Sequence, residues 1–292
     1  MDRDCHSCGC EAVLSRPVPD TGSTGQPGKP TVLCLSGLDP TGGAGIQADI
    51  ETLFACGCHC LPVITSLTAQ DTGNVLRSQA VAADLLRAQI QALFDDIRVH
   101  AIKIGLIDSI NTLNLVAEVI ADYPQIPVIA DPVLKAGGGF RFGSDELIAA
   151  YCRRVVPGVT VLTPNTDELN ALCPAEADPN SAATTLLAAG CRHILLTGTH
   201  AQTTDVINTL YHPDAPAESW TWPRLAGSYH GSGCTLASAL AAGLAQGMSV
   251  SEAAANAQAF TWHALQHGWQ AGRGQALPDR RPGNNQPNRA GD

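Results

Sequence analysis

The residues best suited to chemistry form one short turn in the last third of the chain, Gly231-Ser232-Gly233-Cys234. A run of small residues follows and predicts a helix over about 234–246. The N–H groups at a helix start have no acceptor within the helix, so they favour a phosphate or another anion. The positive helix terminus also predicts a lowered pKa for the Cys234 thiol, which would make it a proton acceptor near neutral pH. A capped loop whose cysteine only packs is the alternative.

Two further polar residues stand at the ends of apolar runs that predict strands. The amide of Gln70 can both donate and accept hydrogen bonds, as the edge of a heteroaromatic ring requires. A solvated side chain at a strand end is the alternative. Asp131 directly follows an apolar strand, where it would orient the hydration shell of Mg²⁺ or simply cap a turn.

Asn165 and Glu168 follow another predicted strand and are three residues apart. At the start of a helix they would share a face and support a metal-bound phosphate. The same spacing is that of an ordinary helix cap, so both interpretations stay open.

The elements that must position these residues alternate along the chain. Predicted strands cover 31–37, 61–70, 101–104, 127–133, 159–168 and 193–197, and predicted helices cover 46–55, 81–94, 112–121, 234–246 and 250–267. An antiparallel pair over 205–211 and 218–223 is expected before the turn. This order predicts an α/β fold with a single open, mostly parallel sheet flanked by helices on both faces, and one site along its carboxyl edge.

Composition narrows the class of partner. The 292 residues carry a formal net charge of −10, with 17 Lys and Arg against 27 Asp and Glu, so neither nucleic acid nor an anionic membrane is an expected partner. The N-terminus lacks the apolar region of a signal peptide, and the longest weakly polar run, 234–245, is too short to span a bilayer. We expect a soluble, cytoplasmic protein that acts on a small molecule.

The domain boundaries follow from glycine, proline and cysteine usage. Residues 1–30 predict a mobile extension, 31–280 a folded domain and 281–292 a mobile tail. The eleven cysteines lack regular spacing and lie mostly in apolar segments, which predicts reduced thiols. The cluster Cys5–Cys10 is expected to be part of a disordered terminus rather than a metal site, and the cluster Cys56–Cys60 is expected to pack.

Taken in order, these segments resemble the hydroxymethylpyrimidine/phosphomethylpyrimidine kinases of thiamine biosynthesis, a family with the ribokinase-like fold. The resemblance covers about residues 31–280 and rests on the stretches 37–49, 63–70, 103–106, 131–133, 163–165 with Glu168, and 230–236. It implies ATP-dependent phosphorylation of 4-amino-5-hydroxymethyl-2-methylpyrimidine and then of its monophosphate, with Mg²⁺, in a homodimer.

The resemblance also implies roles for individual residues. Cys234 would remove the hydroxyl proton, and the N–H groups of Gly231, Ser232, Gly233 and Cys234 would stabilise the transferring phosphoryl group. Gln70 would bind the aminopyrimidine edge, in a pocket shaped by Gly37, Ala44, Asp49, Leu106 and Val133. Nucleotide and Mg²⁺ would be supported by Asp131, Asn165, Glu168, Thr197 and Gly198, with no direct protein ligand to the metal assigned.

Departures from the family pattern leave rivals open. Ser232 replaces a usual Thr, which keeps the hydroxyl group and the turn. Leu106 replaces a frequent Met, which conserves the volume of the side chain. Thr197-Gly198-Thr199-His200 replaces a frequent Lys-Gly-Gly-His, so a cation near the ATP phosphates is missing. The rivals are a pyridoxal or pyridoxine kinase on the same fold, and a pyrimidine-binding protein that has lost turnover.

Overall fold

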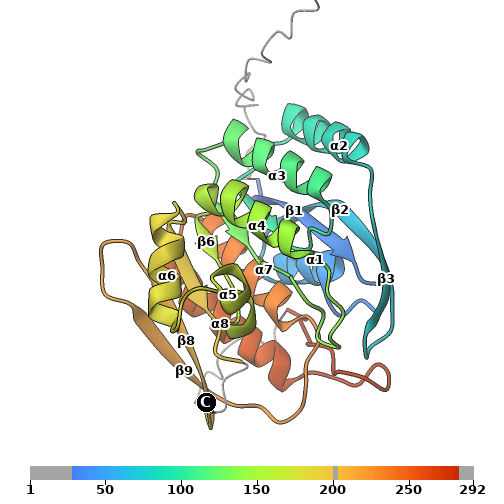
Figure 1. The fold of residues 1–292 in the computed structure, drawn as a ribbon. Coiled ribbons are helices and arrows are strands. Elements are labelled where there is room, and N and C mark those ends of the chain that lie inside the picture. Colours follow the sequence, from blue (N-terminus) through green and yellow to red (C-terminus); the bar gives the residue numbers. More distant parts are fainter. Residues whose placement is uncertain (1–27, 200–202, 283–292) are drawn as a thin grey trace, which may run out of the picture.

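The computed structural model describes residues 28–199 and 203–282, which form one nine-stranded sheet with the strand order β3-β2-β1-β4-β5-β6-β7-β8-β9 (Figure 1). Six neighbouring strands run parallel to one another: β2, β1, β4, β5, β6 and β7. Strands β3, β8 and β9 are antiparallel to their neighbours. The strands are β1 (Thr31–Leu38), β2 (His59–Gln70), β3 (Val75–Ala80), β4 (Ala101–Ile104), β5 (Val128–Ala130), β6 (Val161–Leu162), β7 (His193–Leu196), β8 (Asp205–Tyr211) and β9 (Glu218–Pro223).

Helices cover both faces of this sheet. One face carries α1 (Gly45–Ala55), α7 (Ser232–Ala245) and α8 (Val250–Gln266). The other carries α2 (Ala83–Asp96), α3 (Ile110–Asp122), α4 (Asp145–Arg154), α5 (Thr166–Leu172) and α6 (Pro179–Ala188), with the short 3₁₀ helix η1 (Val156–Gly158) after α4. The predicted α/β fold with an open, mostly parallel sheet is therefore confirmed.

Strand β1 explains why both faces need helices. Successive side chains of a strand point to opposite faces, and both sets are apolar here. Leu33 and Leu35 belong to the core beneath α2 and α3, whereas Val32 and Cys34 belong to the core beneath α1 and α7. A strand that is buried on both sides can be stable only in the middle of a three-layer sandwich.

The predicted elements differ from the structure at several boundaries. The antiparallel pair β8–β9 matches its prediction, but α2 begins at Ala83 rather than at 81 and ends at Asp96 rather than at 94. The strand predicted over 159–168 is wrong at its end, because β6 covers only Val161–Leu162 and α5 begins at Thr166.

Strand β3 and helices α4 and α6 were not predicted. Strand β3 buries only Val75 fully and α6 has a weak amphipathic pattern, so contacts elsewhere in the fold decide these two elements. Helix α4 is clearly amphipathic, with Leu147, Ile148, Ala150 and Tyr151 buried, so its omission from the predicted elements was an error.

Most of the predicted extension, residues 1–30, and most of the predicted tail, 281–292, lies outside the described residues, as does the cluster Cys5–Cys10. Both segments therefore stay predictions. Within the described ranges, no helix has the length and the apolar character needed to cross a membrane.

Candidate active site

The turn singled out in the sequence stands at the carboxyl edge of the sheet, where it begins α7. Gly231 is the N-cap of this helix and has a φ of 77°, in the left-handed region that favours glycine. A Cβ atom at Gly231 would lie 1.9 Å from the carbonyl oxygen of Gly43, so the backbone of the β1–α1 loop occupies the space of a side chain. No side chain caps the helix. The N–H groups of Ser232, Gly233 and Cys234 belong to its first turn, where no intrahelical acceptor exists.

Cys234 lies on this first turn, but its environment differs from the expected one. The side chain is 9% exposed. Burial raises the pKa of its thiol to about 12, against the opposing effect of the Lys103 ammonium. The expected lowering of the pKa is therefore wrong for this structure, because desolvation of the thiolate outweighs the helix terminus. At neutral pH the sulfur carries its proton, and hydrogen bonding from this side chain partly offsets the effect of burial on the pKa of Asp131.

A buried ion pair lies beneath Cys234. The Lys103 Nζ atom in β4 is 2.8 Å from Asp49 Oδ1 in α1, and both side chains are fully buried. Ser36 donates to Asp49 Oδ2 at 2.6 Å, and Ser238, one helical turn after Cys234, donates to Asp49 Oδ1 at 2.6 Å. The carboxylate of Asp49 is thus fully engaged by the protein. Its implied place in the substrate pocket can only be indirect, through the elements that it connects.

Asp131 and Glu168 form a second buried set of acidic groups. Asp131 follows β5 directly, and a Cβ atom at Gly233 would lie 3.5 Å from its Oδ2 atom, so the carboxylate faces the first turn of α7. Burial raises the pKa of Asp131 to about 6, although Lys103 opposes the shift. Burial and the charge of Asp131 raise the pKa of Glu168 to about 8.

The two carboxylates repel each other, and a cation between or beside them would relieve that repulsion. Oxygen donors of this kind suit Mg²⁺, which usually keeps several water ligands and takes few from a protein. Among the described residues, no group of three or more His, Cys, Asp or Glu side chains could hold a metal ion. Two neighbouring acids are nevertheless donors of the kind that fit a hydrated Mg²⁺, which they would contact through water.

Asn165 and Glu168 form a capping box at the start of α5. The Asn165 side chain accepts from the Glu168 N–H group at 2.9 Å, and the Glu168 carboxylate accepts from the Asn165 N–H group at 2.9 Å. The helix-cap interpretation is thus confirmed. Thr197 lies beside Asn165 in a parallel bridge, and the Gly198 N–H group donates to Asn208 at 3.0 Å. These four residues are gathered at the ends of β6 and β7.

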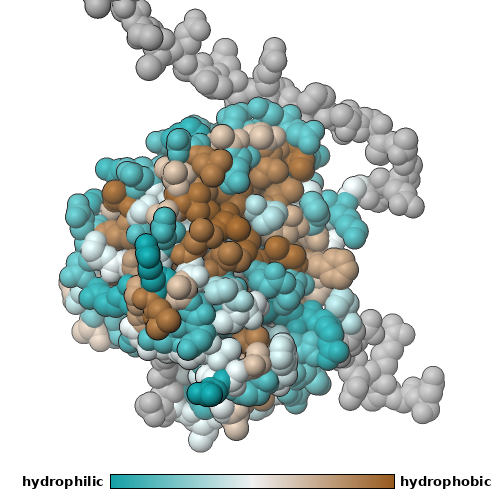
Figure 2. Space-filling model, turned by 90° about the vertical axis from the view of Figure 1, so that its right-hand side faces the viewer, coloured by the Kyte–Doolittle hydropathy of each residue, from teal (hydrophilic) through white to brown (hydrophobic). Residues whose placement is uncertain are grey.

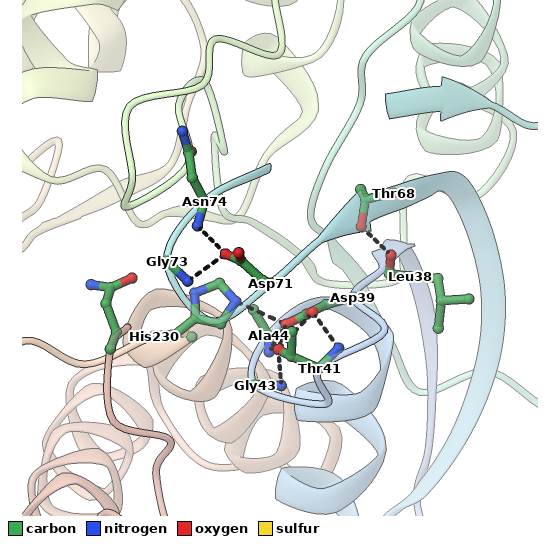
Figure 3. Close-up of polar contacts among 12 residues, drawn as sticks. Leu38, Asp39, Thr41, Gly43, Ala44, Thr68, Asp71, Gly73, Asn74 and His230 are labelled. Atoms are coloured by element: carbon green, nitrogen blue, oxygen red, sulfur yellow. Dashed lines mark hydrogen bonds and ion pairs between the residues drawn. The ribbon is translucent and has the colours of Figure 1, made fainter. Parts of the chain in front are cut away.

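The Gln70 end of the site is built from loops around Asp39 (Figure 3). Asp39 accepts hydrogen bonds from the N–H groups of Thr41 and Ala44, both at 2.8 Å, and is paired with His230 Nε2 at 2.8 Å. Burial opposes ionisation of Asp39, but hydrogen bonds led by those from His230 and Gln70 hold its pKa below the usual value. The half-buried Gln70 therefore faces the loop that joins β1 to α1.

A pocket of about 190 Å³, part of it open to solvent, adjoins this cluster. It is lined by the β2–β3 turn, the glycines of the hairpin after β5, and two residues from further along the chain: Gln70, Asp71, Thr72, Gly73, Asn74, Val75, Ala136, Gly137, Gly138, His230 and Gln275. Gln70 thus lines a concave part of the surface, and its role as a ligand-binding amide stays a prediction.

The other residues that the resemblance assigns to the substrate pocket do not all lie together. Gly37 and Leu106 are both buried and in direct contact, since a Cβ atom at Gly37 would lie 2.8 Å from Leu106 Cδ2. Ala44 is the N-cap of α1. Val133 is half-buried and lines a different, apolar pocket with Leu134, Ile148 and Tyr151. The Tyr151 hydroxyl is buried there without a hydrogen-bond partner.

Sequence reasoning missed three functional candidates. Lys103 lies in the stretch 103–106, to which the sequence assigned no separate role. A lysine inside the apolar run Ala101–Ile104 is itself a signal, since lysine is almost never fully buried without a partner. His230 lies in the stretch 230–236, and its contact with Asp39, which is 191 residues away, leaves no local signal. Arg280 lies at the end of an irregular segment whose local pattern gives no signal.

A parallel α/β sheet with helices on both faces, whose carboxyl edge holds a glycine-bracketed helix N-terminus beside buried acids, defines a ribokinase-like phosphotransferase. A sequence model of the phosphomethylpyrimidine kinase family matches residues 39–279 of this chain, so the chain belongs to that family.

Individual relatives agree with this assignment. A hydroxymethylpyrimidine/phosphomethylpyrimidine kinase of Streptomyces coelicolor is 38% identical over 251 residues, which are 84% of this chain and 92% of that protein. The Escherichia coli enzyme of the same name is 35% identical over 72% of this chain and 81% of its own.

Solved structures show the same fold. A Bacillus subtilis pyridoxal kinase solved as an ADP complex has a TM-score of 0.78 and 26% identity, covering 87% of this chain and 98% of that one. A Clostridium difficile phosphomethylpyrimidine kinase has a TM-score of 0.71 and 27% identity, covering 81% of this chain and 100% of that one.

Proposed function

We propose that this protein transfers the γ-phosphoryl group of ATP to the hydroxymethyl oxygen of 4-amino-5-hydroxymethyl-2-methylpyrimidine, and then to the phosphate of the resulting monophosphate. The observation that carries the proposal is the position of Cys234, on the first turn of α7, which the Asp131 carboxylate faces. Membership of the phosphomethylpyrimidine kinase family supports the choice of alcohol.

The chain's own groups suffice to move the hydroxyl proton. The alcohol oxygen forms its new bond to the γ-phosphorus while the bond to the β-phosphate oxygen of ATP breaks, and ADP leaves. The hydroxyl proton passes to the Cys234 sulfur, and the thiol's own proton passes to Asp131, whose pKa of about 6 keeps it ionised and ready to accept at neutral pH.

The first turn of α7 stabilises the charge that develops on the phosphoryl group. The N–H groups of Ser232, Gly233 and Cys234 point outward from a helix terminus that carries partial positive charge. Mg²⁺, when bound, neutralises phosphate charge, and Asp131 and Glu168 would hold its water ligands, with Asn165 fixing Glu168 through the capping box. Thr197 and Gly198 close the nucleotide side of the site.

Gln70 would recognise the pyrimidine. Its amide can donate to a ring nitrogen and accept from the amino group, and its contact with Asp39 orients it. Gly37 and Leu106, which are buried and in contact with each other, would shape this pocket from behind.

A coupled assay of ADP release tests the function directly. The pyrimidine alcohol, its monophosphate and pyridoxal are supplied separately with Mg²⁺ and ATP. We expect turnover with the first two, with kcat/KM for pyridoxal lower by at least about tenfold. A preference for pyridoxal would favour the rival kinase, which the fold of the Bacillus subtilis enzyme makes a specific alternative. Binding of the pyrimidine without ADP release would instead favour the non-catalytic rival.

A homodimer and a cytoplasmic location complete the proposal. Figure 2 shows a broad apolar area on the side of the molecule where β3 lies. Elements on that side expose the large apolar side chains of Ile50, Phe54, Leu67, Leu76 and Leu85. A second copy of the chain would cover such an area, which sedimentation velocity of wild type and of Leu76→Asp would test.

The eight free cysteines of the described residues suit a reducing compartment that also holds ATP.

A further inference from the structure

Arg280 comes from the irregular segment after α8, yet its side chain ends inside the candidate active site. The residue is 4% exposed. Its Nε atom donates to the Thr235 hydroxyl at 2.9 Å, and its Nη1 atom is paired with the Glu51 carboxylate at 3.0 Å. Its Nη2 atom donates to the Gly43 carbonyl oxygen at 2.5 Å. One guanidinium therefore connects α7, α1 and the loop between β1 and α1.

Two of these acceptors also contact the residue that opens the turn. The Gly43 carbonyl lies against Gly231, at the place where a side chain would stand. The Thr235 hydroxyl donates to the Gly231 carbonyl at 2.8 Å. Gly231 has no side chain to anchor it and the helix has no side-chain cap, so its position depends on its neighbours. Arg280 holds both of those neighbours.

We propose that Arg280 is a positioning residue for phosphoryl transfer, which holds the β1–α1 loop against the turn Gly231–Cys234 so that the N–H groups of the turn stay aimed at the transferring group. The inference rests on the proposed function of that turn. A planar guanidinium can satisfy three acceptors in fixed directions at once, whereas an ammonium on a flexible stem cannot. A small misplacement of stabilising groups is enough to reduce the rate strongly.

The test compares Arg280→Met and Arg280→Lys with Arg281→Met. The neighbouring Arg281 side chain is 79% exposed and paired with Asp279, so it is a matched control. We expect Arg280→Met to lower kcat by about tenfold to a hundredfold, with KM for the alcohol changed by less than about threefold. Arg280→Lys should fall between Arg280→Met and wild type, because it keeps the charge and loses the geometry. Arg281→Met should stay within about twofold of wild type.

A second readout does not need the alcohol. The complex of ADP with aluminium fluoride resembles the transferring phosphoryl group, and its binding should weaken about tenfold in Arg280→Met and remain unchanged in Arg281→Met. If wild type binds this complex but does not phosphorylate the pyrimidine, the proposed function fails while Arg280 is still tested.

The inference is overturned if Arg280→Met has a lowered melting temperature but, measured well below it, wild-type kcat and wild-type binding of the fluoride complex. Arg280 would then serve stability alone. If Arg280→Met cannot be obtained folded, Thr235→Val removes one acceptor at constant size, and we expect a loss of kcat of about three- to tenfold. An unchanged kcat in that variant would equally contradict the proposal.

Discussion

The two ends of the candidate site are built in opposite ways. At the Cys234 end, charged side chains are buried and paired: Lys103 and Asp49 are 0% exposed, and Arg280 is 4% exposed. At the Gln70 end, the largely buried pair Asp39–His230 is the exception: most polar groups belong to loops, and Asp71, Gly73 and Asn74 of the β2–β3 turn are exposed. Figure 3 shows the hydrogen bonds of this second end running mostly within single turns.

This difference suggests that the Cys234 end serves the chemical step, whereas the Gln70 end serves recognition of the substrate. Buried charges tolerate no loss of a partner, so the groups around Cys234 are fixed in one arrangement by large energies. Hydrogen bonds within exposed loops are worth little, so the Gln70 end can change its residues without unfolding the domain. We expect substitutions at the first end to affect folding and kcat, and those at the second to affect mainly substrate binding.

Lys103→Met should give the largest effect on stability. Removing the ammonium leaves Asp49 charged and buried beside only Ser36 and Ser238, which costs about 3–5 kcal/mol. Urea unfolding measures the loss. The double variant Lys103→Met, Asp49→Asn removes both charges and should recover most of it. Equal instability of the single and double variants would show that the pair itself is not what holds this end together.

Cys234→Ala should reduce kcat by about a hundredfold or more, while the Kd of the pyrimidine alcohol changes little, because the variant loses the proton relay to Asp131. Steady-state kinetics and titration calorimetry separate the two quantities. Cys191→Ala, at a buried cysteine on the far side of the sheet from α7, is a suitable comparison. Normal turnover in Cys234→Ala would remove the sulfur from the mechanism.

The acids Asp131 and Glu168 predict a pH dependence of stability. Their folded pKa values of about 6 and about 8 lie above the ordinary values of 3.8 and 4.5, so the folded protein binds protons more tightly than the unfolded chain. Their contribution is complete below pH 4 and is lost as the pH rises to about 8.

The free energy of unfolding should therefore fall between pH 5 and 8 by about 3 kcal/mol more in wild type than in Glu168→Gln. Urea titrations of both proteins at several pH values measure this difference, and the subtraction removes the contribution of other groups. Parallel pH dependences in the two proteins would contradict the raised pKa of Glu168.

Gln70→Leu should have the smallest effect of the four, confined to recognition. The pyrimidine loses its hydrogen-bonding partner, so we expect its Kd to rise about tenfold while unfolding in urea stays nearly unchanged. Gln79→Leu, at an exposed position of β3, controls for the change of residue type. A large loss of stability in Gln70→Leu would mean that the Gln70 end is as rigid as the Cys234 end.

The local pattern of the chain determined most of the fold. Strand β1 is apolar on both faces, so it predicts a central strand between two helical layers, and the alternation of strands and helices predicts a parallel sheet. The same reasoning placed Cys234, Asp131, Asn165 and Gln70 along one sheet edge, because parallel strands end there. Elements with a weak hydrophobic pattern, such as β3 and α6, were not predicted, since tertiary contacts rather than periodicity stabilise them.

Only the tertiary structure decided the electrostatics of the site. Whether the Cys234 thiol has a low or a high pKa depends on burial and on Lys103, which is 131 residues away in the chain. The contacts of Arg280 with Gly43 and Thr235 join parts of the chain that share no local pattern. Hydrophobic periodicity predicts which face of a helix or strand is buried. It does not predict which charged residue from a distant part of the chain lies against that face, because this depends on how the elements pack.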